Sequence, residues 1–91
     1  MIVVDNYDNS CEEALNRVKA IVGEDASKRL TYYEADCCDK ATLDGVFAKS
    51  GKIDAVIHFA GLKAVGESVA KPMRYYDNNI SSTLVLCETM A

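Results

Sequence analysis

Residues 55–60 read Ala-Val-Ile-His-Phe-Ala, and the strand that they predict decides the fold of this chain. The sequence is almost continuously apolar from residue 53 to residue 60, which is typical of a central parallel strand covered on both faces. Because neighbouring parallel strands are joined by long crossovers, usually helices, the rest of the chain is expected to alternate strands with helices.

The first 35 residues predict two earlier strands with a helix between them. Residues 1–4 are wholly apolar, and residues 30–35 are rich in Thr and Tyr, which favour strands. Ser10 and Glu13 have the spacing of a capping box, which predicts that a helix begins there and ends at Gly23. The apolar residues of this helix recur every three or four positions, at Cys11, Leu15, Val18 and Val22.

Two further helices are predicted after the second and third strands. Asp39 is expected to cap the first of them, and Ser50-Gly51 to end it. Its apolar side carries Leu43, Val46 and Phe47. The last helix is expected to begin near Pro72, because proline suits the first helical turn. Its residues at helical spacing are Met73, Tyr76, Ile80, Leu84, Cys87 and Ala91. Three strand–helix repeats predict an α/β domain with a parallel sheet and right-handed crossovers.

Composition and charge exclude several classes of protein. Apolar residues make up 49% of the chain and charged residues 26%, as in ordinary globular domains. The net charge of -4 lacks the basic surface that nucleic acid binding needs. No apolar run approaches the roughly 18 residues of a membrane span, and Asp5 interrupts the opening run too early for a signal peptide. Nucleic acid, membranes and secretion are therefore not expected.

The cysteines are expected to be reduced, unliganded thiols in the cytoplasm. They are Cys11, Cys37, Cys38 and Cys87. A secreted disulfide framework would need loops rich in Gly and Pro together with a secretory address. The chain has one histidine and no C-x-x-C pair, so we expect no metal site.

Candidate ligand-binding residues follow the predicted strands, since ligands of open α/β sheets bind beyond the carboxyl ends of the strands. Asp5 can accept hydrogen bonds from the ribose hydroxyls of a dinucleotide, or it can cap a turn. Asp36 can accept a hydrogen bond from an adenine amino group, or it can cap the next helix together with Asp39. Gly61 permits close approach of a ligand, and Lys63 can place positive charge beside a pyrophosphate.

Other polar residues lie within the predicted strand and helix. His58 is inside an apolar strand, which favours a hydrogen-bonded core histidine over a ligand or an acid. Tyr75 and Tyr76 point to different helix faces, so at least one is expected to pack. Asn78 and Asn79 are unusual inside a helix, because asparagine competes with the backbone for hydrogen bonds, and they point to a site.

These residues also carry a resemblance to a known family. Residues 56–69 read Val-Ile-His-Phe-Ala-Gly-Leu-Lys-Ala-Val-Gly-Glu-Ser-Val, followed by Lys71-Pro72 and, at 75–79, Tyr-Tyr-Asp-Asn-Asn. With residues 4–6, Asn9-Ser10 and Asp36 in the same order, the chain resembles the UDP-glucose 4-epimerase family over essentially all 91 residues. The long central motif distinguishes that family from most other extended short-chain dehydrogenases/reductases.

The resemblance implies that the chain binds NAD. Asp5 would hold the adenosine ribose. The loop that would line the same end consists of Asn6, Tyr7, Asp8, Asn9 and Ser10. Asp36 and Cys37 would flank the adenine, Cys37 mainly through its backbone. The segment that would run beneath the pyrophosphate and the nicotinamide ribose consists of Phe59, Ala60, Gly61, Leu62 and Lys63. Asn78 would support the nicotinamide end.

The resemblance further implies a partial Rossmann-like domain over residues 1–91. The family begins with a strand and a G-x-x-G-x-x-G turn, and no three glycines of this sequence have that spacing. No tyrosine is followed by a lysine four residues later, as in the family's catalytic Tyr-x-x-x-Lys, so no catalytic residue is expected here. Because the strand order of such domains is 3-2-1-4, the absent first strand would lie between residues 1–4 and residues 53–60.

A complete enzyme of this kind would interconvert UDP-galactose and UDP-glucose through a 4-keto intermediate, with bound NAD taking the hydride from C4 and returning it to the other face. It would be a cytoplasmic homodimer, and these residues alone would be inactive. Two alternatives remain open. One is a nucleotide-sugar dehydratase or decarboxylase of the same superfamily, and the other is a non-enzymatic α/β interaction module.

Overall fold

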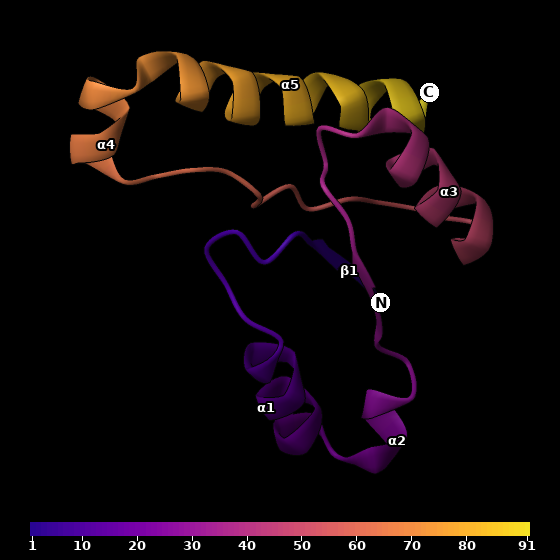
Figure 1. Cartoon of the computed structure of the whole chain (residues 1–91). Coiled ribbons are helices and arrows are strands. Elements are labelled where there is room, and N and C mark those ends of the chain that lie inside the picture. The colour runs from indigo at the N-terminus through magenta and orange to yellow at the C-terminus, as the bar shows by residue number, and fades with distance from the viewer. The chain divides into compact units, whose positions relative to one another are not determined.

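The computed structural model describes all of residues 1–91, in two compact units, Met1–Asp36 and Cys37–Ala91 (Figure 1). The first unit contains β1 (Ile2–Asp5), α1 (Glu13–Val22), α2 (Glu24–Ser27) and β2 (Thr31–Glu34). The second contains α3 (Lys40–Ser50), α4 (Val65–Ala70) and α5 (Pro72–Met90). The predicted α/β class is confirmed, whereas the short helices α2 and α4 were not predicted.

The first unit is built on a two-stranded parallel sheet. β1 pairs with β2 in a register that sets Val3 opposite Tyr32 and Asp5 opposite Glu34. The helices α1 and α2 lie in the connection, as a parallel pair requires. Both predicted strands therefore form, each within one residue of its expected bounds, and Ala35 just after β2 is buried.

The capping-box prediction for α1 is wrong. The N-cap residue is Glu12, which makes no capping bond through its side chain. Ser10 instead donates a hydrogen bond from Oγ to Oδ1 of Asp5, 2.8 Å away. Gly23 ends α1 as predicted, with a φ of 87° that favours glycine. The apolar series of this helix is not a core face, because Val18 and Val22 are both more than 40% exposed, at 43% and 46%.

The core of the second unit lies between α3 and α5. Leu43 and Val46 of α3 and Leu86 of α5 are all buried. α3 begins as predicted, because Asp39 accepts hydrogen bonds from the amide and the hydroxyl of Thr42. These bonds hold the pKa of the Asp39 carboxyl below its usual value. The cap therefore stabilises the fold above the ordinary pKa of aspartate, and this contribution is lost as the pH falls through the lowered pKa.

Residues 53–60 form no strand, so the prediction of three strands is wrong. The sheet has two strands, and residues 51–64 belong to no helix or strand. Ile57 is 78% exposed and Phe59 is 91% exposed. A strand is stable only when its backbone groups pair with a neighbour. The sheet consists of β1 and β2, and neither of them pairs with residues 53–60.

α5 begins at Pro72 as predicted, but it buries a different face from the one expected. Four residues of the predicted apolar series are 49% to 73% exposed, and they are Met73, Tyr76, Ile80 and Leu84. Ser82 and Leu86 are buried instead, because that side of α5 is contacted by α3 and by the irregular residues 51–64, which we call the extended segment. No helix of the chain has the length and apolar character needed to cross a lipid bilayer.

Candidate functional site

In the first unit, the carboxylate of Asp5 organises the loop that follows β1. Its Oδ1 atom accepts hydrogen bonds from the backbone amide of Tyr7 and from the hydroxyl of Ser10, each 2.8 Å long. Its Oδ2 atom accepts no hydrogen bond from the chain. Tyr7 adopts a left-handed conformation, with a φ of 59°, and this turns the loop back toward the strand end. Asp5 is thus held in place with one oxygen available to a ligand.

Stacked tyrosines support the same loop. The rings of Tyr7 and Tyr32 lie 5.1 Å apart between centroids and 24° from parallel. The hydroxyl of Tyr32 donates a hydrogen bond to the carbonyl oxygen of Asp5, 2.9 Å away, and burial raises the pKa of this tyrosine. The amide of Asp8 donates to Oδ1 of Asn6 over 3.0 Å. Of the predicted loop residues, Asn6, Asp8, Asn9 and Ser10 are exposed.

The residues expected beside adenine follow β2. Asp36 is exposed and is the last residue of the first unit, while Cys37 is half-buried and begins the second. The N-cap of α3 is Asp39. All four cysteines are free thiols.

In the second unit, Asn79 of α5 holds the backbone of Leu62. Its Oδ1 atom accepts a hydrogen bond from the Leu62 amide, and its Nδ2 atom donates one to the Leu62 carbonyl, each 2.8 Å long. Nδ2 of Asn78 donates to the same Oδ1 atom over 2.9 Å. Sγ of Cys38 donates to the Asn78 carbonyl over 3.4 Å. The predicted residues Leu62 and Asn78 are thereby brought into one network through Asn79, for which the sequence suggested no specific role.

Gly61 lies beside a side chain of α5. A Cβ atom on this glycine would lie 3.4 Å from Oδ1 of Asn79, at van der Waals contact. The backbone at Gly61 therefore lies close to the Asn79 side chain. Of the other residues predicted in this segment, Phe59, Ala60 and Lys63 are exposed.

His58 has the hydrogen-bonding neighbour that was predicted, but it is half-buried and lies in no strand, so it is not a core histidine. Its Nε2 atom lies 3.4 Å from Oγ of the buried Ser82 of α5. This contact and the two bonds to Leu62 both join the segment before α4 to the same helix. The polar residues on the buried side of α5 therefore hold a chain segment that has no regular structure of its own.

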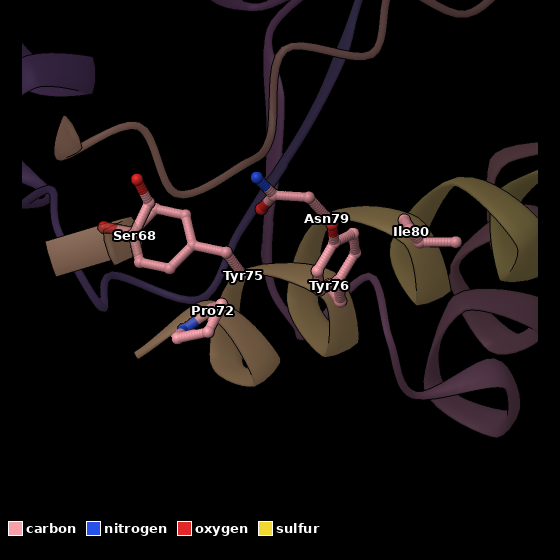
Figure 2. Close-up of a pocket in the computed structure, with 6 residues that line it drawn as sticks. All are labelled: Ser68, Pro72, Tyr75, Tyr76, Asn79 and Ile80. Carbon is pink, nitrogen blue, oxygen red and sulfur yellow. The ribbon is translucent and has the colours of Figure 1, made fainter. Parts of the chain in front are cut away.

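A hollow that was not predicted lies along α4 and α5, with a volume of about 370 Å³. Its lining residues, drawn in Figure 2, are Ser68, Pro72, Tyr75, Tyr76, Asn79 and Ile80. The hydroxyl of Tyr75 donates to Oε2 of Glu67 over 2.8 Å, and Arg74 pairs with the same carboxylate. The bond from Tyr75 lowers the pKa of Glu67, while burial raises the pKa of Tyr75. Tyr75 packs and Tyr76 is 60% exposed, as the sequence predicted for the pair.

The chain matches a known protein family and curated proteins over nearly its whole length. The family model for GDP-mannose 4,6 dehydratase matches residues 1–91. A UDP-glucose 4-epimerase of Bacillus subtilis (strain 168) is 59% identical over 90 residues, which are 99% of this chain and 25% of the relative. The chain thus spans about a quarter of the length of the curated relatives that it matches.

Solved structures show the same similarity. The UDP-glucose 4-epimerase of Bifidobacterium longum, in complex with NAD⁺ and UDP, has a TM-score of 0.88 and 56% identity, covering 98% of this chain and 25% of that one. The enzyme of Stenotrophomonas maltophila, with bound NAD and formylated UDP-arabinopyranose, has a TM-score of 0.85 and 35% identity over 98% of this chain and 25% of that one. The predicted resemblance to UDP-glucose 4-epimerases is confirmed.

Proposed function

This chain belongs to the GDP-mannose 4,6 dehydratase family, and from that membership we propose that residues 1–91 form part of the NAD-binding domain of a UDP-glucose 4-epimerase. The observation that carries the proposal is the similarity to UDP-glucose 4-epimerases, which extends over 99% of the chain at 59% identity. The complete enzyme would interconvert UDP-galactose and UDP-glucose. Its catalytic tyrosine and lysine would come from outside these residues, since none of the five tyrosines has a lysine four positions later.

The residues of the chain fit an NAD cofactor. Asp5 is oriented through Oδ1 and has Oδ2 available for a ribose hydroxyl. Lys63 is exposed and cationic, which suits a pyrophosphate. In the proposed site Asp36 and Cys37 flank the adenine, residues 59–63 lie beneath the pyrophosphate and the nicotinamide ribose, and Asn78 supports the nicotinamide end. NAD, when bound, supplies the hydride acceptor and donor of the reaction.

Replacement of Asp5 tests the ribose contact. In the full-length enzyme, Asp5→Asn is expected to weaken NAD binding by about 1–3 kcal/mol, because a charge-assisted hydrogen bond becomes a neutral one. The NAD content of the purified variant measures the effect. Asp25→Asn makes the same chemical change at an exposed position of α2 and should retain NAD normally. Full NAD occupancy in Asp5→Asn would refute the assignment.

Product analysis separates epimerisation from dehydration. The name of the matching family model favours a dehydratase as the second candidate. An epimerase converts UDP-galactose to UDP-glucose without change of mass, whereas a dehydratase releases water. Mass spectrometry and proton NMR of the full-length enzyme's products distinguish the two. A product that is lighter than the substrate by ~18 Da, the mass of one water, would support dehydration and exclude epimerisation as the reaction.

We also propose that the full-length enzyme is a homodimer that uses the exposed face of α5. Four apolar residues recur at helical spacing on that face and are 49% to 73% exposed, and exposed apolar patches mark interaction sites: Met73, Tyr76, Ile80 and Leu84. Ile80→Glu is expected to shift the enzyme from dimer to monomer in sedimentation velocity. The matched control is Ile21→Glu on α1, where Ile21 is 83% exposed. A dimer that persists in Ile80→Glu would argue against this face.

The proposed location is the cytoplasm. Its support is the presence of four free cysteines, which are typical of proteins kept in a reducing compartment. Cell fractionation followed by thiol labelling of the native enzyme tests this, and recovery of the enzyme with oxidised cysteines outside the cytoplasm would refute it.

A further inference from the structure

Asn79 provides to the extended segment the kind of pairing that a neighbouring strand would provide. Its amide group both accepts from Leu62 N and donates to Leu62 O, at 2.8 Å each, and so satisfies both backbone polar groups of one residue. Residues 51–64 have no regular structure, so their position depends on such contacts. The other described contact to α5, between His58 and Ser82, is longer, at 3.4 Å.

Other observations agree that this contact is specifically built. Gly61 lies next to the Asn79 side chain, since a Cβ atom there would be in van der Waals contact with Oδ1, 3.4 Å away. Asn78 donates a third hydrogen bond to the Asn79 amide, 2.9 Å long, which fixes the orientation of that group. In Figure 2 the Asn79 side chain projects from α5 at a point between Tyr75 and Ile80. Asparagine is a poor residue for a helix interior, so its presence there is explained by these bonds and not by helix propensity.

We propose that Asn79 is a positioning residue for the cofactor, holding the backbone of residues 59–63 in the conformation that NAD binds. This inference rests on the proposed function, in which residues 59–63 and Asn78 contact NAD. Asn79 acts through Leu62 and through Asn78, because its Oδ1 atom accepts from both residues and its Nδ2 atom donates to Leu62. Loss of its side chain would remove both hydrogen bonds between Leu62 and α5 and leave the 3.4 Å contact between His58 and Ser82.

The first test replaces Asn79 in the full-length enzyme. Asn79→Ala removes both bonds to Leu62 and is expected to raise the dissociation constant of NAD about tenfold or more. Asn16→Ala on α1 is the matched control, since Asn16 is exposed, and it should leave NAD affinity unchanged. Unchanged NAD affinity in a folded Asn79→Ala enzyme would overturn the inference.

A second variant separates positioning from general stability and also serves if Asn79→Ala does not fold. In Asn79→Asp, an ionised carboxylate can accept from Leu62 N but cannot donate to Leu62 O, whereas a protonated carboxyl can do both. The loss of NAD affinity relative to wild type is therefore expected to be larger at pH 7, where the carboxyl is ionised, than at pH 4, where nearly half of it is protonated at the ordinary aspartate pKa of about 3.9. The other titratable side chains are the same in both enzymes, so their contributions cancel in this ratio. A ratio that is the same at both pH values would contradict the proposed bond pattern.

Hydrogen exchange distinguishes failure of this inference from failure of the proposed function. In wild type the Leu62 amide is expected to exchange about tenfold or more slowly than the same amide in Asn79→Ala. Slow exchange of Leu62 in a wild-type enzyme that binds no NAD would refute the proposed function and leave the contact intact. Equal exchange of Leu62 in the two proteins would refute the role of Asn79, whatever the affinity for NAD.

Discussion

Isolated residues 1–91 are expected to have no epimerase activity and to bind NAD only weakly, with a dissociation constant above the micromolar range. Proton transfer at the sugar 4-hydroxyl needs a positioned acid or base, and the tyrosine–lysine pair of the family is absent from this sequence. Tight NAD binding also needs the glycine-rich turn, whose helix N-terminus holds the pyrophosphate. None of the five glycines provides it. The contacts of the glycine-rich turn cannot be replaced by Asp5, Asp36 and Lys63 alone.

Isothermal titration of the isolated chain with NAD measures this directly, and conversion of UDP-galactose measures the activity. The control is the full-length enzyme under the same conditions, which is expected to retain NAD and to turn over the sugar. A sub-micromolar dissociation constant for the isolated chain would show that the glycine-rich turn is dispensable.

Residues 55–60 are expected to become a protected strand in the full-length enzyme. Their sequence suits a buried parallel strand, yet in this chain Ile57 is 78% exposed and Phe59 is 91% exposed. Addition of the first strand would pair their backbone on one side. Amides of a central strand exchange only through large-scale opening, which costs several kcal/mol, so their exchange should slow by about 10³-fold or more.

Hydrogen exchange followed by mass spectrometry, with the isolated chain and the full-length enzyme side by side, tests this expectation. Peptides from α3 serve as the internal control, because Leu43 and Val46 are already buried against α5 and their amides lie within a formed helix. Equally fast exchange of residues 55–60 in both proteins would mean that this segment is not a strand of the enzyme.

Elements with local signals were predicted well. Asp39 caps α3, Pro72 opens α5, and Gly23 and Gly51 end their helices at positive φ. These signals depend on hydrogen bonds and backbone angles within a few residues, so the sequence is sufficient to show them. The prediction that Ser10 caps α1 was wrong because another residue nearby in the sequence binds the Ser10 hydroxyl. The nearby Asp5 carboxylate competes for its hydroxyl, and the capping box takes no account of such a competitor.

The candidate site was predicted in part. Asp5 and the residues up to Ser10 do form a hydrogen-bonded loop at the end of β1, as expected of a strand end in an α/β sheet. Asn79 was noted as an unusual helix residue that points to a site, with no partner named. Its partner Leu62 lies 17 residues away in the sequence, and the pairing depends on how the extended segment lies against α5. No local pattern contains that information.

The sequence by itself determined the α/β class, the start and end of α3, the start of α5, and the resemblance to UDP-glucose 4-epimerases. Only the tertiary structure decided that residues 53–60 are not a strand, because strand formation requires a hydrogen-bonded neighbour that periodicity does not reveal. It also decided that α5 turns Ser82 and Leu86 toward α3 and the extended segment while Ile80 and Leu84 stay exposed. The face that a helix buries is set by the elements that contact it, and its own apolar spacing shows only which faces are available.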